Sequence, residues 1–268
     1  MIATAHVIAI VCYIGAAVLA ATPFARPVPV SMRRVGLVLA AGVLAHVCAL
    51  ALLGIRTGAV PITGLGPALS FSGVVLAATL LGVEWSAHEV TLSLLVAPLA
   101  AVVTMCALLI GLAPGPSAVG MRGVWLLAHI ALSFLGIAAF GMAAAAGAMY
   151  LVQRHELRAH RFDRLFRVFP PLATLDRVNH VGLIAGWLGL TIGVVLAVSY
   201  SVQYRELNVP QLTWGIAAWL AAGSVAIGRV MRGWQARRAA VYSSVAFAAV
   251  LLLYVAFRAT AGNGGRFL

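Results

Sequence analysis

Charged residues are scarce in this sequence, and lysine is absent altogether. Only 9% of the 268 residues are charged, whereas 63% are hydrophobic. A water-soluble domain needs far more polar surface than this, so the composition excludes an ordinary soluble protein. The eighteen basic residues, all of them arginine, face only six acidic ones, which gives a net charge of +12.

Cysteine is also rare, and the motifs of the common enzyme classes are missing. Cys12, Cys48 and Cys106 lie inside apolar runs, without a CxxC pair or a histidine at metal-ligand spacing, and are interpreted as small core residues. The string 154–160 is similar to a zinc-protease HExxH, but its second histidine is one residue too far along to share the helix face. No catalytic triad, phosphate loop or dinucleotide fingerprint is present, so we expect no enzyme.

What the sequence has in abundance is long apolar runs. A helix needs roughly 20 apolar residues to cross a hydrocarbon core of about 30 Å. Eight stretches qualify: 2–21, 35–55, 65–83, 90–112, 124–152, 181–200, 212–227 and 239–257. The predicted fold is therefore all-α, a polytopic membrane bundle of about eight transmembrane helices in one integral membrane domain, 1–268.

The first apolar run has small residues at its end, as a signal peptide does. However, it lacks a basic segment before it, and its positive charges, from Arg26 onward, follow it instead. We interpret it as a retained first helix.

The arginines are distributed unevenly between the loops. Loops of one parity hold thirteen of them, while the other parity holds Arg56, Arg122 and Arg205, plus two in the C-terminal tail. By the positive-inside rule the first set is cytoplasmic, so both termini face the non-cytoplasmic side. Because these arginines lie beside apolar runs, they indicate contact with membrane lipids and not with nucleic acid. The longest polar segment, 153–179, is predicted to be a basic linker.

Two patterns inside the apolar runs stand out. Four glycines at 182, 186, 189 and 193 repeat a small-xxx-small spacing that lets neighbouring helices approach closely. Trp125 and His129 are four residues apart, so they share one helix face near the non-cytoplasmic membrane interface. This pair fits either an interfacial tryptophan beside a hydrogen-bonded histidine, or an apolar platform with an axial nitrogen for a haem iron.

The segments 125–134, 151–154, 169–176, 186–193, 213–219 and 232–240 carry a resemblance to a known family. In order and spacing they resemble the cytochrome c assembly family of CcsA, CcmC and HemX-like membrane proteins, over roughly residues 66–257. The eight-helix layout most resembles the HemX-like branch.

The resemblance implies a haem-binding or haem-handling protein of the bacterial plasma (inner) membrane that contributes to cytochrome c assembly. Other assembly proteins of the membrane and apocytochrome c are then the expected partners, and haem the expected cofactor. It puts His129 at the position of an axial ligand to the haem iron. Two alternatives remain. One is a HemX-type regulator or scaffold linked to tetrapyrrole biosynthesis. The other is a transporter, which should show inverted repeats or paired intramembrane charges that this sequence does not show.

The sequence departs from the family pattern in its loop 201–214, which keeps Trp214 but has lost most of the tryptophans that family members carry. No second histidine follows this loop. His6 and His46 are therefore candidates for the other axial ligand, or haem has one protein ligand. Arg122 and Arg205 are candidates for pairing with the haem propionates, since arginine makes bidentate bonds to carboxylates.

Overall fold

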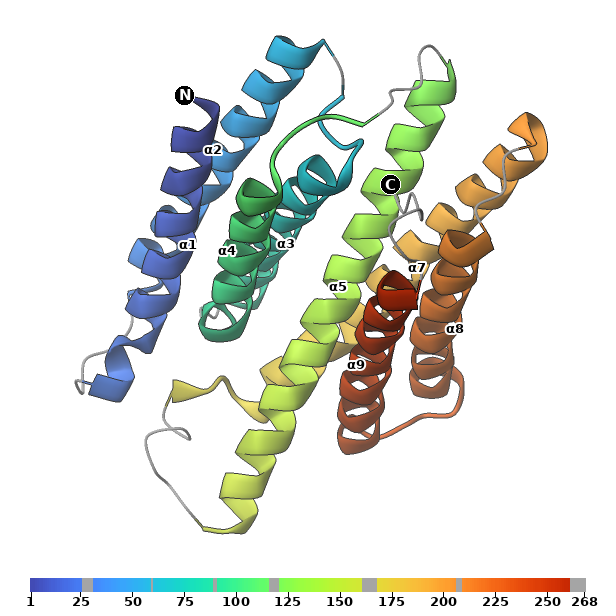
Figure 1. The fold of residues 1–268 in the computed structure, drawn as a ribbon. Helices are drawn as coiled ribbons and strands as arrows, with labels where there is room; N and C mark the ends of the chain where they lie inside the picture. Colours follow the sequence, from blue (N-terminus) through green and yellow to red (C-terminus); the bar gives the residue numbers. More distant parts are fainter. Residues whose placement is uncertain are drawn as a thin grey trace. The chain divides into compact units, whose positions relative to one another are not determined.

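The computed structural model describes residues 1–25, 31–58, 60–88, 91–115, 121–160, 168–205 and 209–260. Within these ranges the chain forms eight helices and no strand (Figure 1). In chain order they are α1 (Ile2–Ala25), α2 (Met32–Thr57), α3 (Leu65–Ala87), α4 (Ser93–Ile110), α5 (Met121–Arg158), α7 (Leu172–Tyr204), α8 (Val209–Met231) and α9 (Ala236–Thr260). Each is long and apolar enough to cross a membrane, which confirms the predicted all-α fold. The predicted sidedness of the termini stays a prediction.

The prediction of a linker over 153–179 is wrong at both of its ends. Helix α5 continues to Arg158, and α7 already begins at Leu172. Pro171 stands immediately before α7, and its carbonyl accepts hydrogen bonds from the backbone N–H groups of Thr174 and Leu175. Hydropathy ends a span where polar side chains begin, but backbone hydrogen bonds continue a helix beyond that point. The remainder of the predicted linker, 161–167, lies outside the described residues.

The described chain divides into two compact units. The first comprises residues 1–117 and 152–175, and the second comprises 118–151 and 176–268. Helix α5 therefore contributes most of its length to the second unit and its C-terminal end to the first.

In the first unit, α1 packs against α2 and α4, while α3 packs against α2 and α4 (Figure 1). The buried residues of α1, among them His6, Ala9, Tyr13 and Ala20, recur at helical spacing and form one stripe. Gly42 of α2 makes room for this stripe, because a Cβ there would lie 2.8 Å from Cε1 of Tyr13. Polar side chains are thus held inside an otherwise apolar helix interface.

A buried carboxyl group links the C-terminal end of α3 to the start of α4. The backbone N–H of Ser93, at the start of α4, donates to Oε1 of Glu84 over 2.8 Å. Glu84 is only 3% exposed. This bond satisfies one of the donors that the first turn of a helix leaves without an intrahelical partner.

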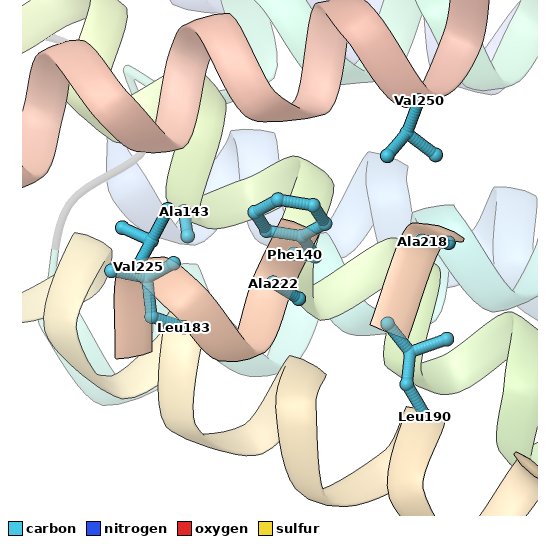
Figure 2. Close-up of a cluster of buried hydrophobic side chains, with 8 residues drawn as sticks. All are labelled: Phe140, Ala143, Leu183, Leu190, Ala218, Ala222, Val225 and Val250. Carbon is cyan, nitrogen blue, oxygen red and sulfur yellow. The ribbon is translucent and has the colours of Figure 1, made fainter. Parts of the chain in front are cut away.

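The second unit is built around a cluster of buried side chains from α5, α7, α8 and α9 (Figure 2): Phe140, Ala143, Leu183, Leu190, Ala218, Ala222, Val225 and Val250. Phe140 is fully buried, and its ring meets that of Phe247 edge-on with centroids 5.4 Å apart. Several cluster members are alanines, which lets the helices approach closely, as is typical of packing without a large hydrophobic driving force in lipid.

Helices α5 and α7 cross at their glycines. A Cβ on Gly136 would lie 2.7 Å from the backbone nitrogen of Leu190, and one on Gly186 would lie 2.9 Å from that of Phe140. The neighbours are backbone atoms, which cannot rotate away. The close approach predicted from the glycine spacing of α7 is thus present, and its partner is α5.

The start of α7 is tied to the end of α8 by an ion pair. Nη2 of Arg229 lies 2.6 and 2.7 Å from the two carboxylate oxygens of Asp176. Nη1 of the same guanidinium donates to the carbonyl of Trp234 over 3.0 Å. The side chains are 13% and 29% exposed, so this charged contact lies partly inside the unit.

Candidate functional site

His129 lies on α5 and faces α7. Its Nδ1 is 2.8 Å from the carbonyl oxygen of Gly193, and Ser133 Oγ lies 3.5 Å from the same nitrogen. A carbonyl can only accept a hydrogen bond, so Nδ1 carries the proton and the neutral ring keeps its lone pair on Nε2. Among the residues that the structure describes, Nε2 has no hydrogen-bond partner. Metal-ligating histidines have this arrangement: one ring nitrogen donates a hydrogen bond to a protein group, and the other is available to the metal.

Trp125 uses the same face of α5. Its indole N–H donates to the carbonyl of Leu196 over 3.1 Å, and its ring meets Tyr204 edge-on at 6.3 Å between centroids. Trp125 and His129 therefore both donate to carbonyls of α7, at positions three residues apart. The pair predicted to share a face does so, and that face is turned toward α7.

Arg122 begins this face, seven residues before His129. Its Nε donates to the hydroxyl of Tyr200 over 2.7 Å, and its guanidinium carbon lies 5.7 and 5.2 Å from the ring centroids of Tyr200 and Tyr204. The two tyrosine rings are 4.7 Å apart. Seven residues are about two turns, so Arg122 and His129 are separated by about 10.5 Å along the helix axis.

Tyr200 and Tyr204 were not predicted to belong to the site. Their spacing of four residues at the end of an apolar run, where interfacial aromatics gather, was the available signal. Stacked against Arg122, they add aromatic surface and fix the position of a positive charge.

Trp214 and Arg205 are placed differently. The indole of Trp214, on α8, donates to the carbonyl of Val250 on α9 over 3.2 Å, and its ring meets Tyr254 at 5.3 Å. Trp214 packs against the buried cluster of the second unit. Arg205 directly follows α7, with a positive φ of 53° and an exposed side chain. Its exposure leaves the guanidinium available to an anionic group, whereas Trp214 serves helix packing.

His6 and His46 belong to the first unit, and both are fully buried. His6 has Nδ1 2.9 Å from the carbonyl of Ile2 and Nε2 2.9 Å from Ser70 Oγ. His46 has Nδ1 3.1 Å from the hydroxyl of Tyr13 and Nε2 2.9 Å from the same Ser70 Oγ. In this structure neither ring offers a free nitrogen to a metal. A role for either as second axial ligand stays a prediction, and it requires that these bonds break.

The donor set can be compared directly with what a haem needs. His129 offers one imidazole nitrogen, a rigid hydrogen bond behind it, and aromatic and cationic side chains on the same face. These residues fit a haem held by one axial ligand. Among the described residues no group of three or more histidine, cysteine or acidic side chains could hold a metal ion directly.

Eight helices that can span a membrane define a multi-pass helical membrane protein. Its sequence matches the family model of the cytochrome C assembly protein over residues 62–262. Since this range covers most of the chain, the protein belongs to that family.

Individual relatives agree with the family match. The chain is 31% identical over 86 residues to the cytochrome c biogenesis protein CcsA of Synechococcus elongatus, which covers 31% of this chain and 26% of the relative. It is 23% identical over 159 residues to CcsA of Prochlorococcus marinus, half of each chain. An uncharacterized 28.8 kDa protein of Azospirillum brasilense is 29% identical over 138 residues. The chain spans from about a quarter to half the length of these relatives. The matches give no support to the HemX-type alternative.

Proposed function

We propose that this protein binds haem and takes part in cytochrome c assembly in the bacterial plasma membrane. The observation that carries the proposal is the state of His129, whose Nδ1 is held by Gly193 while its Nε2 keeps a lone pair. Membership of the assembly family supports the same process. The CcsA relatives are named as cytochrome c biogenesis proteins, and apocytochrome c and other assembly proteins of the membrane are the partners that this function calls for.

In this proposal His129 ligates the haem iron through Nε2. A haem bound here would be the group that is passed on to a cytochrome. The carbonyl of Gly193 orients the imidazole, and the bond from Trp125 to Leu196 holds α5 against α7 about one turn away. Arg122, which Tyr200 holds in position, and the exposed Arg205 would pair with the propionate carboxylates of the haem. The proposal assigns no residue a role in covalent catalysis.

The test is the visible absorption spectrum of protein purified from cells that are replete with haem. The wild type should show a Soret band, and His129→Ala should lose it. His155→Ala is the matched control, because His155 is exposed at the far end of the same helix. Added imidazole should restore the band to His129→Ala, since it replaces the missing ligand without repairing any contact of the fold.

A colourless wild type would refute the proposal. So would a His129→Ala protein whose Soret band equals that of His155→Ala. The spectra of His6→Ala and His46→Ala address the second ligand, because a shift of the band in one of them alone would identify it.

A further inference from the structure

One end of the second unit carries four exposed arginines. The arginine patch is defined here as Arg177 on α7, Arg232 directly after α8, and Arg237 and Arg238 in the first turn of α9. This is the level at which the apolar span of α8 ends and that of α9 begins. The sequence predicted contact with lipids for the arginines beside apolar runs in general. The structure adds that these four lie around one bonded network.

This network joins the ends of three helices. The guanidinium of Arg229, on α8, contacts the carboxylate of Asp176 on α7 and donates to the carbonyl of Trp234, just before α9. One turn further along α7, Nδ2 of Asn179 donates to Oγ of Ser243 on α9 over 2.7 Å, so α7 and α9 lie side by side. Every arginine of the patch is within four residues of Asp176 or Trp234. The network therefore holds the four backbone positions close together.

The charge of the patch is not balanced within the described part of the second unit. Asp176 is the only acidic residue there, and both of its carboxylate oxygens already contact Arg229. In addition, Arg237 and Arg238 stand in the first turn of α9, which contains no acidic residue. Cations at the N-terminal end of a helix are unfavourable, because the helix dipole is positive there. These charges work against the stability of α9, and a bound anion would offset them.

Exposed apolar side chains lie one helical turn from the patch, on the side of the membrane spans. Three of its arginines are followed four residues later, on the same helix face, by Val181 on α7 and by Val241 and Tyr242 on α9. These side chains are 56%, 36% and 48% exposed. The ring of Tyr242 also packs against that of Trp234, with centroids 4.8 Å apart, as is typical of aromatic residues at a membrane interface. Positive charge therefore adjoins apolar surface in the order in which phosphate adjoins acyl chains in a phospholipid.

We propose that the arginine patch is a binding site for an anionic phospholipid, whose acyl chains lie along α7 and α9. Guanidinium groups make bidentate hydrogen bonds to phosphate oxygens. Four of them are more than one phosphate group needs, so a lipid with two phosphate groups, such as cardiolipin, fits best. An acidic protein segment matches the charge but not the apolar surface next to it. The site is independent of the proposed haem site, because it uses none of the residues assigned to haem.

The proposal can be tested by native mass spectrometry of the full-length protein, purified in detergent and freed of bound lipid. Cardiolipin, phosphatidylglycerol and phosphatidylcholine are the probes, and the dissociation constant of each is measured. The wild type should bind cardiolipin most tightly, phosphatidylglycerol less tightly, and phosphatidylcholine weakest of the three. Raising the salt concentration should weaken the binding of cardiolipin, because salt screens exposed charges. Equal affinity for cardiolipin and phosphatidylcholine would overturn the proposal.

The deciding variant replaces three arginines of the patch by glutamine: Arg232→Gln, Arg237→Gln and Arg238→Gln. Each basic residue near an anionic headgroup contributes roughly a factor of five, so the affinity for cardiolipin should fall by about a hundredfold. The matched control makes the same change of net charge at exposed helix ends of the first unit: Arg33→Gln, Arg34→Gln and Arg158→Gln. It should change the affinity by less than about twofold, since these arginines lie outside the patch.

An equal loss of affinity in the two triple variants would show attraction by net charge alone and would overturn the site. Glycerol 3-phosphate, which has the phosphate but no acyl chains, should not displace cardiolipin, and displacement at equal concentration would contradict a lipid site. So would an acidic peptide that binds as tightly as cardiolipin, because it would assign the patch to a protein partner. Circular dichroism checks that the variants fold. If the triple variant of the patch does not fold, Arg232→Gln against Arg158→Gln decides, with an expected loss of about fivefold in the first only.

Discussion

The crossing of α5 and α7 gives the sharpest prediction, because the geometry of His129 depends on it. In Gly136→Ala the new Cβ would lie 2.7 Å from the nitrogen of Leu190, whereas ordinary contacts begin at 3.4 Å. The backbone of α7 must therefore move by about 0.7 Å, since no side chain is available to rotate away. A helix is stiff over one turn, so the carbonyl of Gly193, three residues after Leu190, moves with α7 and changes its distance from His129.

The magnitude follows from two opposing effects. Overpacking of this kind costs about 1–3 kcal/mol, while replacing a helical glycine by alanine gains up to about 1 kcal/mol. The bond from His129 to Gly193, now 2.8 Å, would lengthen to about 3.5 Å, which is outside the useful range for N–H···O bonds. Losing it costs a further 0.5–1.5 kcal/mol or so. We expect Gly136→Ala to lower the free energy of unfolding by about 1–3 kcal/mol in net terms.

Gly215→Ala on α8 is the matched control, because a Cβ there meets nothing within 4 Å. It should stabilise the protein by up to about 1 kcal/mol through helix propensity alone. Denaturant unfolding in detergent, followed by circular dichroism, measures both variants. The 15N shift of His129 Nδ1 should move in Gly136→Ala only. Equal stability of the two variants would refute the reasoning that links the glycine crossing to the histidine.

Two further predictions concern the second unit, and unfolding measurements check both. Phe140→Ala should cost about 3–5 kcal/mol, because it empties a fully buried position at the centre of the cluster; a cost below about 1 kcal/mol would contradict the packing shown in Figure 2. Arg229→Lys should destabilise the protein although it keeps the charge, because an ammonium cannot contact Asp176 and the carbonyl of Trp234 as the planar guanidinium does. The exposed Arg232→Lys should be neutral, and equal stability of the two lysine variants would show that the fork geometry is unimportant.

The helices were predictable because hydropathy and helix formation coincide in a membrane. Every backbone polar group in the membrane must form its hydrogen bond inside the segment, so an apolar run long enough to span the membrane forms a helix. The prediction was wrong where this coupling ends. Residues 153–158 and 172–179 are polar enough to leave the bilayer, yet they continue α5 and begin α7. Pro171, placed just before a helix start, was the signal that the segment turns helical again.

For the candidate site, the sequence predicted which residues share a face of α5, but not which helix that face contacts. Spacing alone put Trp125 and His129 on a common face, and Arg122 at an interval of seven residues belongs to the same face. Which helix that face would meet depends on tertiary packing. The carbonyls of Gly193 and Leu196 that hold the two rings are backbone groups, and a backbone acceptor leaves no trace in residue identity.

The same limit explains why three histidines that looked alike in the sequence differ in the structure. His6, His46 and His129 all lie in apolar runs, and all were candidate ligands. A neutral ring can bind a metal only if the lone pair on its unprotonated nitrogen accepts no hydrogen bond, and this depends on how many donors and acceptors the neighbouring helices offer. Around His6 and His46 the partners account for both nitrogens of each ring, through the shared hydroxyl of Ser70. Around His129 a single carbonyl fixes Nδ1 and leaves Nε2. The first arrangement occupies both nitrogens of each ring, whereas the second leaves one nitrogen for a metal, so the number of hydrogen-bond partners and not the residue type separates the two sites.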